Sequence, residues 1–363
     1  MDLQVTQENL NKALGTVARV ANTRGTLPVL ANVLIKTVNN RLSIAATNLD
    51  IAITNYIGAK VAAEGAITVP ARLMQDFVSS LPGGVIDLKL DDLKLNIVTE
   101  QYQSVINGVS AEEFPVMPAI SEGKKWAVPA PLLKKSLQQV IVAASGDEAR
   151  PVLTGVYLHV TDGKLYMAAT DSYRLAEKEL LATTEDISLL VPVSAMQDLL
   201  RIVSDAEDDV RVTSDEQQVL FQIGDVELVA RLIEGKYPDY RKLIPDSFST
   251  TATLKRADLL NATKISSLFA RESAGSITLN VDEASQELSI RSVASQLGEN
   301  TAKASAKVDG GGAITLNSRY LLDALQVLSG EEVQFCFNGK LEPSVLRDPA
   351  SSDYVHIIMP LKS

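Results

Sequence analysis

Hydrophobic residues recur along this chain with two different periods. Between Gln7 and Asn22, leucine and valine return every three or four positions, which predicts an amphipathic helix. The segments Val85–Leu90 and Leu93–Val98 instead alternate apolar and polar residues on either side of a short acidic turn, which predicts a β-hairpin. Strands of this kind follow one another through turns and without crossover helices, so the pattern indicates an α+β fold with antiparallel sheets.

One pattern occurs three times: the end of an apolar strand runs directly into a short amphipathic helix. The three occurrences are Val69 to Phe77, Val191 to Arg201 and Leu316 to Leu325. Other segments repeat at the same interval of about 123 residues, for example Leu42 to Asn48 and Leu165 to Asp171. A chain that repeats at a third of its length is built from three copies of one domain. We expect these domains to span residues 1–122, 123–250 and 251–363.

Each copy is expected to contain two helices among several strands. Further helices are predicted over Pro131–Ser145 and Ala257–Arg271, and a strand over Val29–Thr37. A linear array of three such domains leaves an open sheet edge at each end, and open edges must be covered or paired. Charged loops could cap both ends, or the first domain of one chain could pair with the third domain of another and close a ring.

Composition excludes several classes of protein. The chain has 363 residues with a single cysteine, Cys336, and only two histidines, so neither an intrachain disulfide nor a Cys/His zinc site is expected. No apolar run approaches the ~20 residues of a membrane span. No basic segment followed by an apolar one opens the sequence, as a signal peptide would. We therefore expect a cytoplasmic protein that uses no metal and no cofactor.

The charge is unevenly distributed. With 34 basic and 45 acidic residues the formal net charge is −11, which taken alone disfavours a nucleic-acid partner. The predicted helices, however, carry more basic than acidic side chains. Their basic residues are Lys12, Arg19, Arg72, Lys134, Lys135, Arg201, Lys264, Arg271 and Arg319. These are either solvated helix faces or parts of one cationic surface that holds phosphates without reading bases.

Motifs of common catalytic sites are absent from the sequence. It contains no GxxxxGK[ST] phosphate loop, no Gly-x-Ser-x-Gly elbow and no HExxH helix. Asp171 close to Arg174 is interpreted as a buried ion pair or a turn cap, because the first copy has Asn48 at the position of Asp171. A two-carboxylate hydrolase and a purely structural scaffold are the alternatives that the residues leave open.

Three motifs, taken together and in order, resemble the bacterial β sliding-clamp family, the processivity factors of DNA polymerase III. They are Ala169 to Ala176, Tyr237 to Arg241 and the terminal Ile357 to Lys362. The resemblance covers the whole chain, including Thr26 to Leu30 and the threefold repeat. It implies a non-catalytic, head-to-tail homodimer of three-domain crescents whose ring encircles duplex DNA, with helices lining the inside.

The resemblance also implies an apolar cleft for short linear peptides of the polymerase III catalytic subunit, the clamp loader, other polymerases and repair proteins. Its residues would be Leu153, Thr170, Ser172, Tyr173, Arg174, Leu175, Pro238, Lys242, Leu243, Pro343, Ser344, Ile357, Met359, Pro360 and Leu361. DNA contacts would come from Arg24 and from basic side chains such as Arg19, Lys12, Arg72, Lys134, Lys135, Arg150, Arg201, Lys264 and Arg271. The expected dimer contacts are Val105, Ile106, Leu268 and Phe269. Some relatives have Gly-His where this chain has Ser172-Tyr173, so we expect a reshaped cleft mouth.

Overall fold

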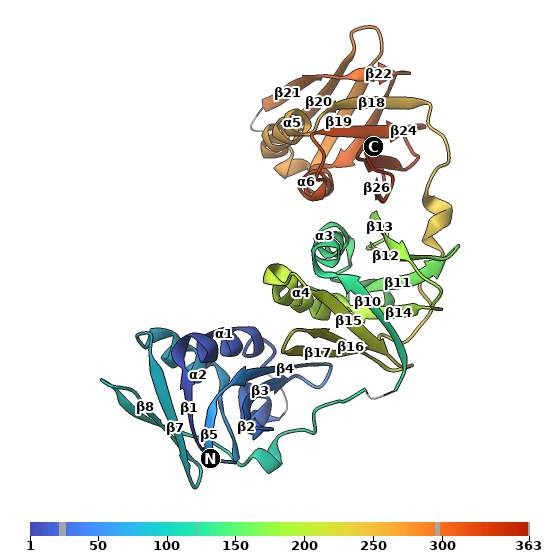
Figure 1. The fold of residues 1–363 in the computed structure, drawn as a ribbon. Coiled ribbons are helices and arrows are strands. Elements are labelled where there is room, and N and C mark those ends of the chain that lie inside the picture. Colours follow the sequence, from blue (N-terminus) through green and yellow to red (C-terminus); the bar gives the residue numbers. More distant parts are fainter. Residues whose placement is uncertain (22–26, 121, 295–297, 362–363) are drawn as a thin grey trace. The chain divides into compact units, whose positions relative to one another are not determined.

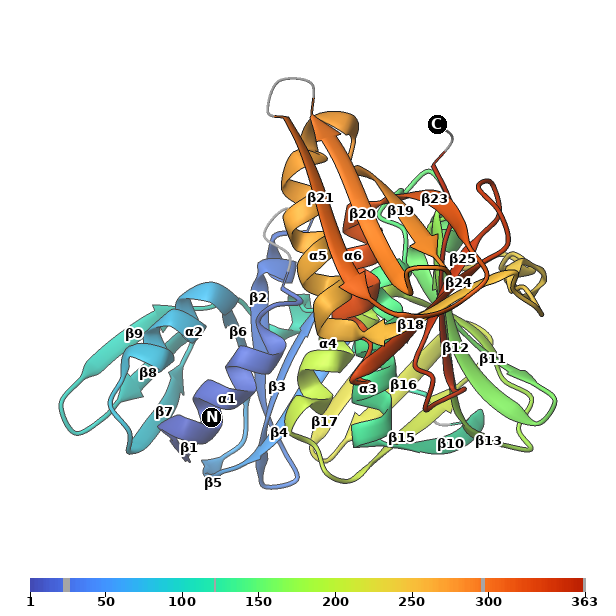
Figure 2. The same cartoon turned by 90° about the horizontal axis from the view of Figure 1, so that it is seen from above.

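The computed structural model describes residues 1–21, 27–120, 122–294 and 298–361 (Figures 1 and 2). Within them, six α-helices and four antiparallel sheets confirm the α+β class and the two helices expected in each copy. The helices are α1 (Gln7–Val17), α2 (Ala71–Ser80), α3 (Ala130–Val140), α4 (Val193–Ile202), α5 (Arg256–Phe269) and α6 (Ser318–Val327). None of the helices in these ranges is long and apolar enough to cross a membrane.

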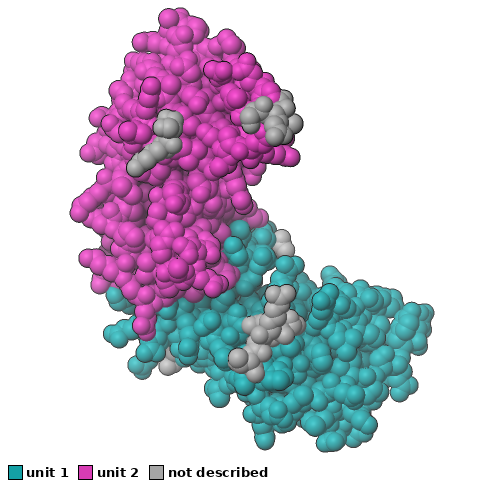
Figure 3. Space-filling model, turned by 180° about the vertical axis from the view of Figure 1, so that it is seen from behind, with its two compact units in different colours: residues 1–131, 197–232 teal, residues 132–196, 233–363 magenta. Residues whose placement is uncertain are grey.

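Two compact units make up the chain (Figure 3): residues 1–131 with 197–232, and residues 132–196 with 233–363. We call them unit 1 and unit 2. Each unit holds one long and one short sheet. The division passes through the second copy of the repeat, because some of its strands pair with the first copy and others with the third.

Unit 1 contains a five-stranded and an eight-stranded sheet. In spatial order the first is β5 (Lys60–Ala63), β1 (Asp2–Thr6), β7 (Val85–Asp91), β8 (Lys94–Val98) and β9 (Gln103–Asn107). The second is β10 (Lys124–Pro129), β15 (Asp209–Ser214), β16 (Gln218–Ile223), β17 (Val226–Arg231), β4 (Ile51–Gly58), β3 (Arg41–Thr47), β2 (Asn32–Val38) and β6 (Ala66–Pro70). β7 and β8 form the predicted hairpin. In Figure 1, α1 and α2 lie side by side, and α1 packs on β3 and β4.

Unit 2 contains a nine-stranded and a four-stranded sheet. The first is β14 (Ser188–Pro192), β11 (Gly155–Thr161), β12 (Lys164–Thr170), β13 (Arg174–Ala182), β26 (Tyr354–Ile358), β25 (Ser344–Arg347), β24 (Glu332–Phe337), β18 (Thr250–Lys255) and β22 (Lys307–Asp309). The second is β21 (Gly298–Ser305), β20 (Glu287–Ala294), β19 (Ser276–Asp282) and β23 (Gly312–Asn317). Figure 2 shows α5 and α6 side by side, with α5 packed along β20 and β21.

Each unit has a seam where strands from two copies of the repeat pair. In unit 1 the first seam is β4 with β17, and in unit 2 the second seam is β13 with β26. The second seam carries the fully buried Lys178, whose ammonium donates to Asp353. Asp353 also accepts a hydrogen bond from Ser351, and these contacts lower the pKa of its carboxyl although burial acts in the opposite direction. A buried ammonium with a carboxylate partner avoids the cost of an unpaired charge.

Four predicted elements differ in extent from the structure. The helix predicted over Pro131–Ser145 ends at Val140, and a 3-10 turn, Ile141–Ala143, follows it. α1 ends at Val17 instead of Asn22, because the next residues form a turn closed by the Val20 N–H on the Val17 carbonyl. The segment predicted as a strand from Val29 begins as a 3-10 turn, Pro28–Ala31, since proline favours the first helical position. The helix predicted to reach Arg271 ends at Phe269, and a 3-10 turn then leads to a left-handed residue, Ala274.

Candidate functional site

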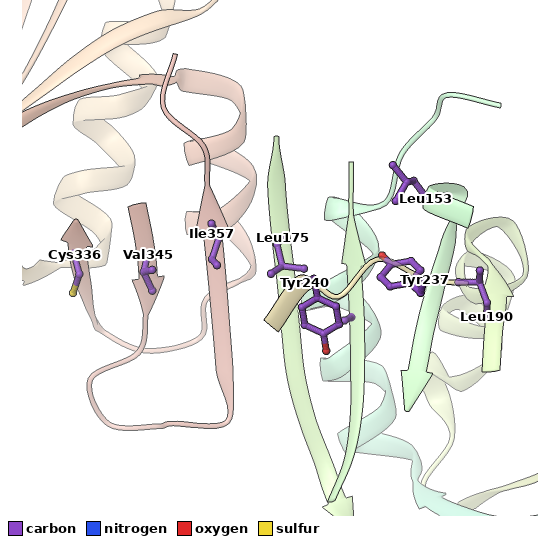
Figure 4. Packing of buried hydrophobic residues seen from close by; sticks show 9 residues of the cluster. Leu153, Leu175, Leu190, Tyr237, Tyr240, Cys336, Val345 and Ile357 are labelled. Atoms are coloured by element: carbon purple, nitrogen blue, oxygen red, sulfur yellow. The ribbon is translucent and has the colours of Figure 1, made fainter. Parts of the chain in front are cut away.

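The floor of the candidate peptide site is a row of apolar side chains across four neighbouring strands of unit 2. Cys336 is paired with Val345, Val345 with Ile357, and Ile357 with Leu175 (Figure 4). Because paired residues point to the same face of a sheet, these four side chains lie on one surface. The buried cluster that they join also includes Leu153, Ala168, Leu190, Tyr237 and Tyr240. Thus Leu153, Leu175 and Ile357 of the predicted site form its floor.

A turn between β12 and β13 brings four predicted residues to the edge of this floor. The Thr170 hydroxyl donates to the Arg174 carbonyl at 2.6 Å and accepts from the Ser172 N–H at 3.1 Å. One Asp171 carboxylate oxygen accepts from the N–H groups of Tyr173 and Arg174, both at 2.9 Å. Ser172 therefore sits in the left-handed region at φ 78°. Asp171 is therefore a turn cap, and it also forms a mostly buried ion pair with Arg174, so both roles expected for it are present.

Arg174 is held from three sides. Its Nε lies 3.1 Å from an Asp171 carboxylate oxygen, and its Nη1 lies 2.6 Å from Asp323 on α6. Its guanidinium also stacks over the Tyr320 ring at 4.6 Å. The side chain is mostly buried, so these contacts are weakly screened by solvent. Arg174 therefore joins β13 to α6 and fixes the position of the turn at the edge of the site.

The chain's last described residues close one side of the site. The Met359 N–H donates to the Tyr173 carbonyl at 2.8 Å, and the Leu361 N–H donates to the Thr315 carbonyl at 2.8 Å. Met359 packs on the buried cluster while remaining partly exposed, as do Pro360 and Leu361. On the neighbouring strand, the buried Ser344 hydroxyl donates to the Ile358 carbonyl. This segment is fixed by backbone hydrogen bonds and still presents apolar side chains to solvent.

The mouth of the site is exposed, and its basic side chains Arg150 and Lys242 are each paired with a carboxylate. Arg150 binds Asp147 and donates from Nη1 to the Ser172 hydroxyl at 3.0 Å. It therefore lies at this mouth and not on a predicted helix. Lys242, in the 3-10 turn Tyr240–Leu243, pairs with Asp239 at 2.7 Å. The remaining predicted residues at the mouth are Tyr173, Pro238 and Leu243, which are exposed, and Pro343, which is partly buried.

Sequence reasoning missed several residues of this floor. Ala168, Leu190, Cys336 and Val345 lie on interior strands, where nothing in a single sequence separates them from ordinary core residues. Tyr237 belongs to a motif already identified, and its repeat-equivalent Phe114 is equally buried. The repetition of this aromatic residue in two copies was the sequence feature that could have identified Tyr237 as part of the floor.

A polar network underlies the same turn. The Tyr240 hydroxyl donates to Glu177, so its oxygen is left to accept from His159 Nε2 at 2.5 Å. Nδ1 of His159 then accepts from the Thr161 hydroxyl at 3.1 Å. Arg241 closes the network through Glu177, 2.9 Å away, and stacks over Tyr166. These bonds hold the 3-10 turn that carries Lys242 and Leu243.

Both histidines are buried and neutral. Burial, with a smaller contribution from Arg241, lowers the pKa of His159 to about 4. Burial, with a smaller contribution from Arg174, lowers the pKa of His356 to about 3. His356 Nδ1 contacts the Tyr354 hydroxyl at 2.8 Å, whereas its Nε2 has no hydrogen-bond partner among the described residues. This supports the structural role expected for His356.

We expect acid to destabilise the protein through these histidines. The unfolded chain takes up protons near pH 6.5, whereas the folded chain takes them up only near pH 4 or below, so stability falls as pH drops between these values. For each histidine the expected loss is about 0.7 kcal/mol between pH 7 and 6, and it approaches about 1.4 kcal/mol per pH unit between pH 6 and 5. Urea unfolding at pH 7, 6 and 5 measures it. A His159→Gln, His356→Gln double variant should lose this dependence, and an unchanged slope would contradict the assignment.

Basic residues of unit 1 gather where α1 meets α4. Lys12, Thr16 and Arg201 line one cavity of about 700 Å³. Arg19, in the turn after α1, lines a neighbouring hollow with Arg201 and Asp198. Arg201 binds Asp198 at 2.5 Å, and burial raises the pKa of this carboxyl although Arg201 and Arg19 oppose it. Three of the predicted DNA contacts thus share one polar surface.

The other predicted DNA contacts are placed separately. Arg72 on α2 is exposed and lies 3.9 Å from Asp76. In unit 2, Lys134 and Lys135 are partly buried on α3, Lys264 is exposed on α5, and Arg271 is exposed in the 3-10 turn that follows α5. Because α5 ends before it, Arg271 does not share a helical stripe with Lys264. Arg24 lies outside the described residues.

The predicted dimer contacts lie near two outermost strands. β9 ends the five-stranded sheet of unit 1, and β21 ends the four-stranded sheet of unit 2. Val105 on β9 is 52% exposed, and Leu268 on α5, which packs on β21, is 51% exposed. Ile106 is only 5% exposed, since alternate residues of a strand face opposite sides, and Phe269 is partly buried. Of the four predicted dimer contacts, Val105 and Leu268 therefore present large exposed side chains.

Family models match the chain in three consecutive parts. Residues 1–118 match the N-terminal domain of the DNA polymerase III beta subunit, residues 127–239 its central domain, and residues 241–362 its C-terminal domain. Among the described residues, no group of three or more His, Cys, Asp or Glu side chains is placed to hold a metal ion.

Full-length relatives carry the name beta sliding clamp. The protein from Synechocystis sp. is 32% identical, covering 100% of this chain and 99% of its own. The protein from Bacillus subtilis is 29% identical over 100% of both chains. Among solved structures, the DNA polymerase sliding clamp of B. subtilis matches with a TM-score of 0.95 at 28% identity, covering 100% of this chain and 99% of that one.

A clamp of Pseudomonas aeruginosa solved with griselimycin also matches, with a TM-score of 0.95 at 25% identity over 100% of both chains. The repeat, the sheet topology and these full-length matches agree. The chain belongs to the DNA polymerase III β sliding-clamp family, whose members are non-catalytic factors that confer processivity on the replicative polymerase.

Proposed function

We propose that this protein acts in the cytoplasm as a homodimeric ring that encircles duplex DNA and holds polymerases and repair proteins on it. Three domains, residues 1–122, 123–250 and 251–363, would make up each half of the ring. The observation that carries the proposal is the apolar row of unit 2, together with exposed Tyr173 and Leu243 and partly exposed Met359. Because the chain belongs to the clamp family, we expect short linear peptide segments of partner proteins to bind at this row.

The peptide site would bind short linear segments of the polymerase III catalytic subunit, the clamp loader, other polymerases and repair proteins. An apolar floor supplies affinity, while a few polar groups at the rim fix orientation. Partly exposed methionine suits a site with several partners, because its unbranched side chain adapts to different shapes. Tethering raises the local concentration of the polymerase at the primer end, so weak DNA affinity becomes effective retention.

DNA would be held by charge without base recognition. Lys12, Arg19 and Arg201 would make these contacts from a polar surface of unit 1 that also carries Asp198, Glu207, Asp208 and Asp225. Contacts of this kind weaken steeply with salt because they release counterions from the phosphates. A ring would nevertheless remain on DNA at high salt, since its retention is topological. Pairing of β9 of one chain with β21 of another would close that ring.

The decisive experiment compares circular and linear DNA. The protein is loaded onto nicked circular duplex DNA and washed in about 0.5 M salt, a concentration that disrupts weak phosphate contacts. The DNA is then cut once. We expect persistence on the circle and rapid release after cutting. Blocking both ends of the linear DNA with bound protein should restore retention. Equal retention on circular and open linear DNA would refute encirclement.

A further inference from the structure

A cavity of about 700 Å³ lies at the first seam, between α1, the end of α4 and the strands β4, β16 and β17. All the residues that line it belong to unit 1. Its volume is in the range of small-molecule sites. The equivalent part of the second seam indicates which ligand would fit.

The two seams correspond residue by residue at this point. Asn55 is paired with Val226 in the first seam, and Lys178 is paired with Tyr354 in the second. Asn55 and Lys178 are 123 residues apart, which is the interval of the repeat. Val226 therefore stands at the position of Tyr354. Residues that face the helices in one seam thus have named counterparts in the other.

Large buried side chains of the second seam are replaced by smaller ones in the first. Lys178, Tyr354 and the α3 residue Gln139 are at most 4% exposed. The Tyr354 hydroxyl donates to the Gln139 carbonyl, so these side chains are packed against α3. Their counterparts all line the cavity: Asn55, Val226 and Thr16. The first seam therefore lacks the lysine and the tyrosine that occupy this place in the second.

The amide of Asn55 is left without a partner. Asn55 is 7% exposed and lines the cavity, and no hydrogen bond to its side chain is formed within the described residues. In the second seam the ammonium of Lys178 donates to Asp353. The counterpart of Asp353 is Asp225, which is bound by Arg41 from β3. A nearly buried polar group without a partner is costly, so the Asn55 amide is available to a ligand.

The charged groups around the cavity favour a cation. Glu207 and Asp208 line it, and in the described part of the chain neither forms an ion pair. Arg201 and Asp225 also line it, but each is bound by an oppositely charged residue. Lys12 is the opposing charge, again without an ion pair among the residues described. Two unpaired carboxylates against one unpaired ammonium attract a cation more than an anion.

We propose that this cavity binds a small arylalkylamine, an aromatic ring joined by a short chain to a primary ammonium. The ring would take the place that Tyr354 fills in the second seam, against the aliphatic side chains of Ile57 and Ile223, which line the cavity. The ammonium would take the place of the Lys178 ammonium and donate to the Asn55 amide oxygen. The proposal goes beyond the proposed tethering function, because it gives unit 1 a small-molecule site.

Three matched probes test it on the full-length protein at neutral pH. Tyramine has a phenol ring and an ammonium, para-ethylphenol lacks the charge, and para-hydroxyphenylpropionate carries a carboxylate instead. Methyl NMR of ¹³C-labelled isoleucine reports on the cavity through Ile57 and Ile223, and Ile265, exposed on α5, is the control signal. We expect tyramine to shift the two cavity signals saturably, with an affinity at least tenfold above that of either analogue. An affinity no higher than that of an analogue, or no shift at Ile57 and Ile223, would overturn the proposal.

Filling the cavity as the second seam does provides a second test. Val226→Tyr restores the tyrosine of the second seam, and we expect it to weaken tyramine at least tenfold. Val85→Tyr is the matched control, because Val85 is exposed on β7 and does not line the cavity. It should change the affinity less than twofold. Undiminished tyramine binding by a folded Val226→Tyr variant would place the site elsewhere.

Removal of the amide separates the role of Asn55 from that of the cavity. Asn55→Leu keeps the size of the side chain and removes its hydrogen-bonding groups. We expect tyramine to bind this variant at least tenfold more weakly, while the affinity for para-ethylphenol stays within twofold. Unchanged methyl signals outside the cavity show that the variant is folded. Equal tyramine affinity of the variant and the original protein would refute the assigned contact with Asn55.

Discussion

Deletion of residues 359–363 is expected to weaken binding of a polymerase-derived peptide at least 100-fold without changing the dimer. The Met359 N–H and the Leu361 N–H anchor this segment on Tyr173 and Thr315, and Met359 packs on the buried cluster. Burial of one methionine contributes roughly 1.5–3 kcal/mol. A 100-fold loss corresponds to about 2.8 kcal/mol, so removal of the segment's apolar contacts is sufficient.

Fluorescence anisotropy with a labelled peptide measures this affinity, and sedimentation measures the assembly. Leu73→Ala is a suitable control, because Leu73 is an exposed leucine of α2 in unit 1 that makes no part of the site. It should leave peptide affinity within twofold. If the deleted protein still binds the peptide with its original affinity, the site has been misplaced.

Charges at the two outermost strands should separate the dimer. A Val105→Lys, Leu268→Lys double variant places charges of the same sign on two of the large exposed side chains near β9 and β21. Edge strands that carry lysine resist pairing with another chain. Burying both charges without designed partners costs several kcal/mol, so we expect the dimer dissociation constant to rise at least 100-fold. Sedimentation over a range of protein concentrations checks this.

Val85→Lys provides the matched control. Val85 is 54% exposed and lies on β7, an interior strand of the sheet that ends in β9. The same change there should leave the dimer intact, because no strand edge is altered. The double variant should also lose retention on circular DNA while keeping its peptide affinity. A stable dimer of the double variant would place the contact elsewhere.

The sequence predicted the repeat, the three segments in which a strand runs directly into a helix, and the β7–β8 hairpin, because each depends on local spacing. Helix ends were less predictable: α1 stops at Val17 although Val20 continues its apolar stripe. A backbone turn ends the helix, and the side chains of the apolar stripe do not indicate where this turn occurs. Periodicity describes which face is apolar better than it describes where a helix ends.

The candidate site was predictable only in part, for a related reason. Its residues came from a resemblance, and four of them, Leu153, Leu175, Ile357 and Met359, belong to or pack on one apolar cluster of unit 2. The contacts that support them join distant parts of the chain, such as Arg174 with Asp323 and His159 with Tyr240. Neither pair has a sequence signature, because ion pairs and hydrogen bonds of this separation depend on the assembled sheet.

The seams also determine where the chain can be cut. β17 and β13 both belong to the second copy of the repeat, yet each completes its sheet only through a strand of another copy. A fragment that contains the second copy alone would have two exposed edge strands, β17 and β13. Each of these edges could pair with a strand of another molecule and cause aggregation. The sequence repeats with one copy as its unit, whereas each long sheet needs strands from two copies. A fragment without open seam edges must therefore contain more than one copy of the repeat.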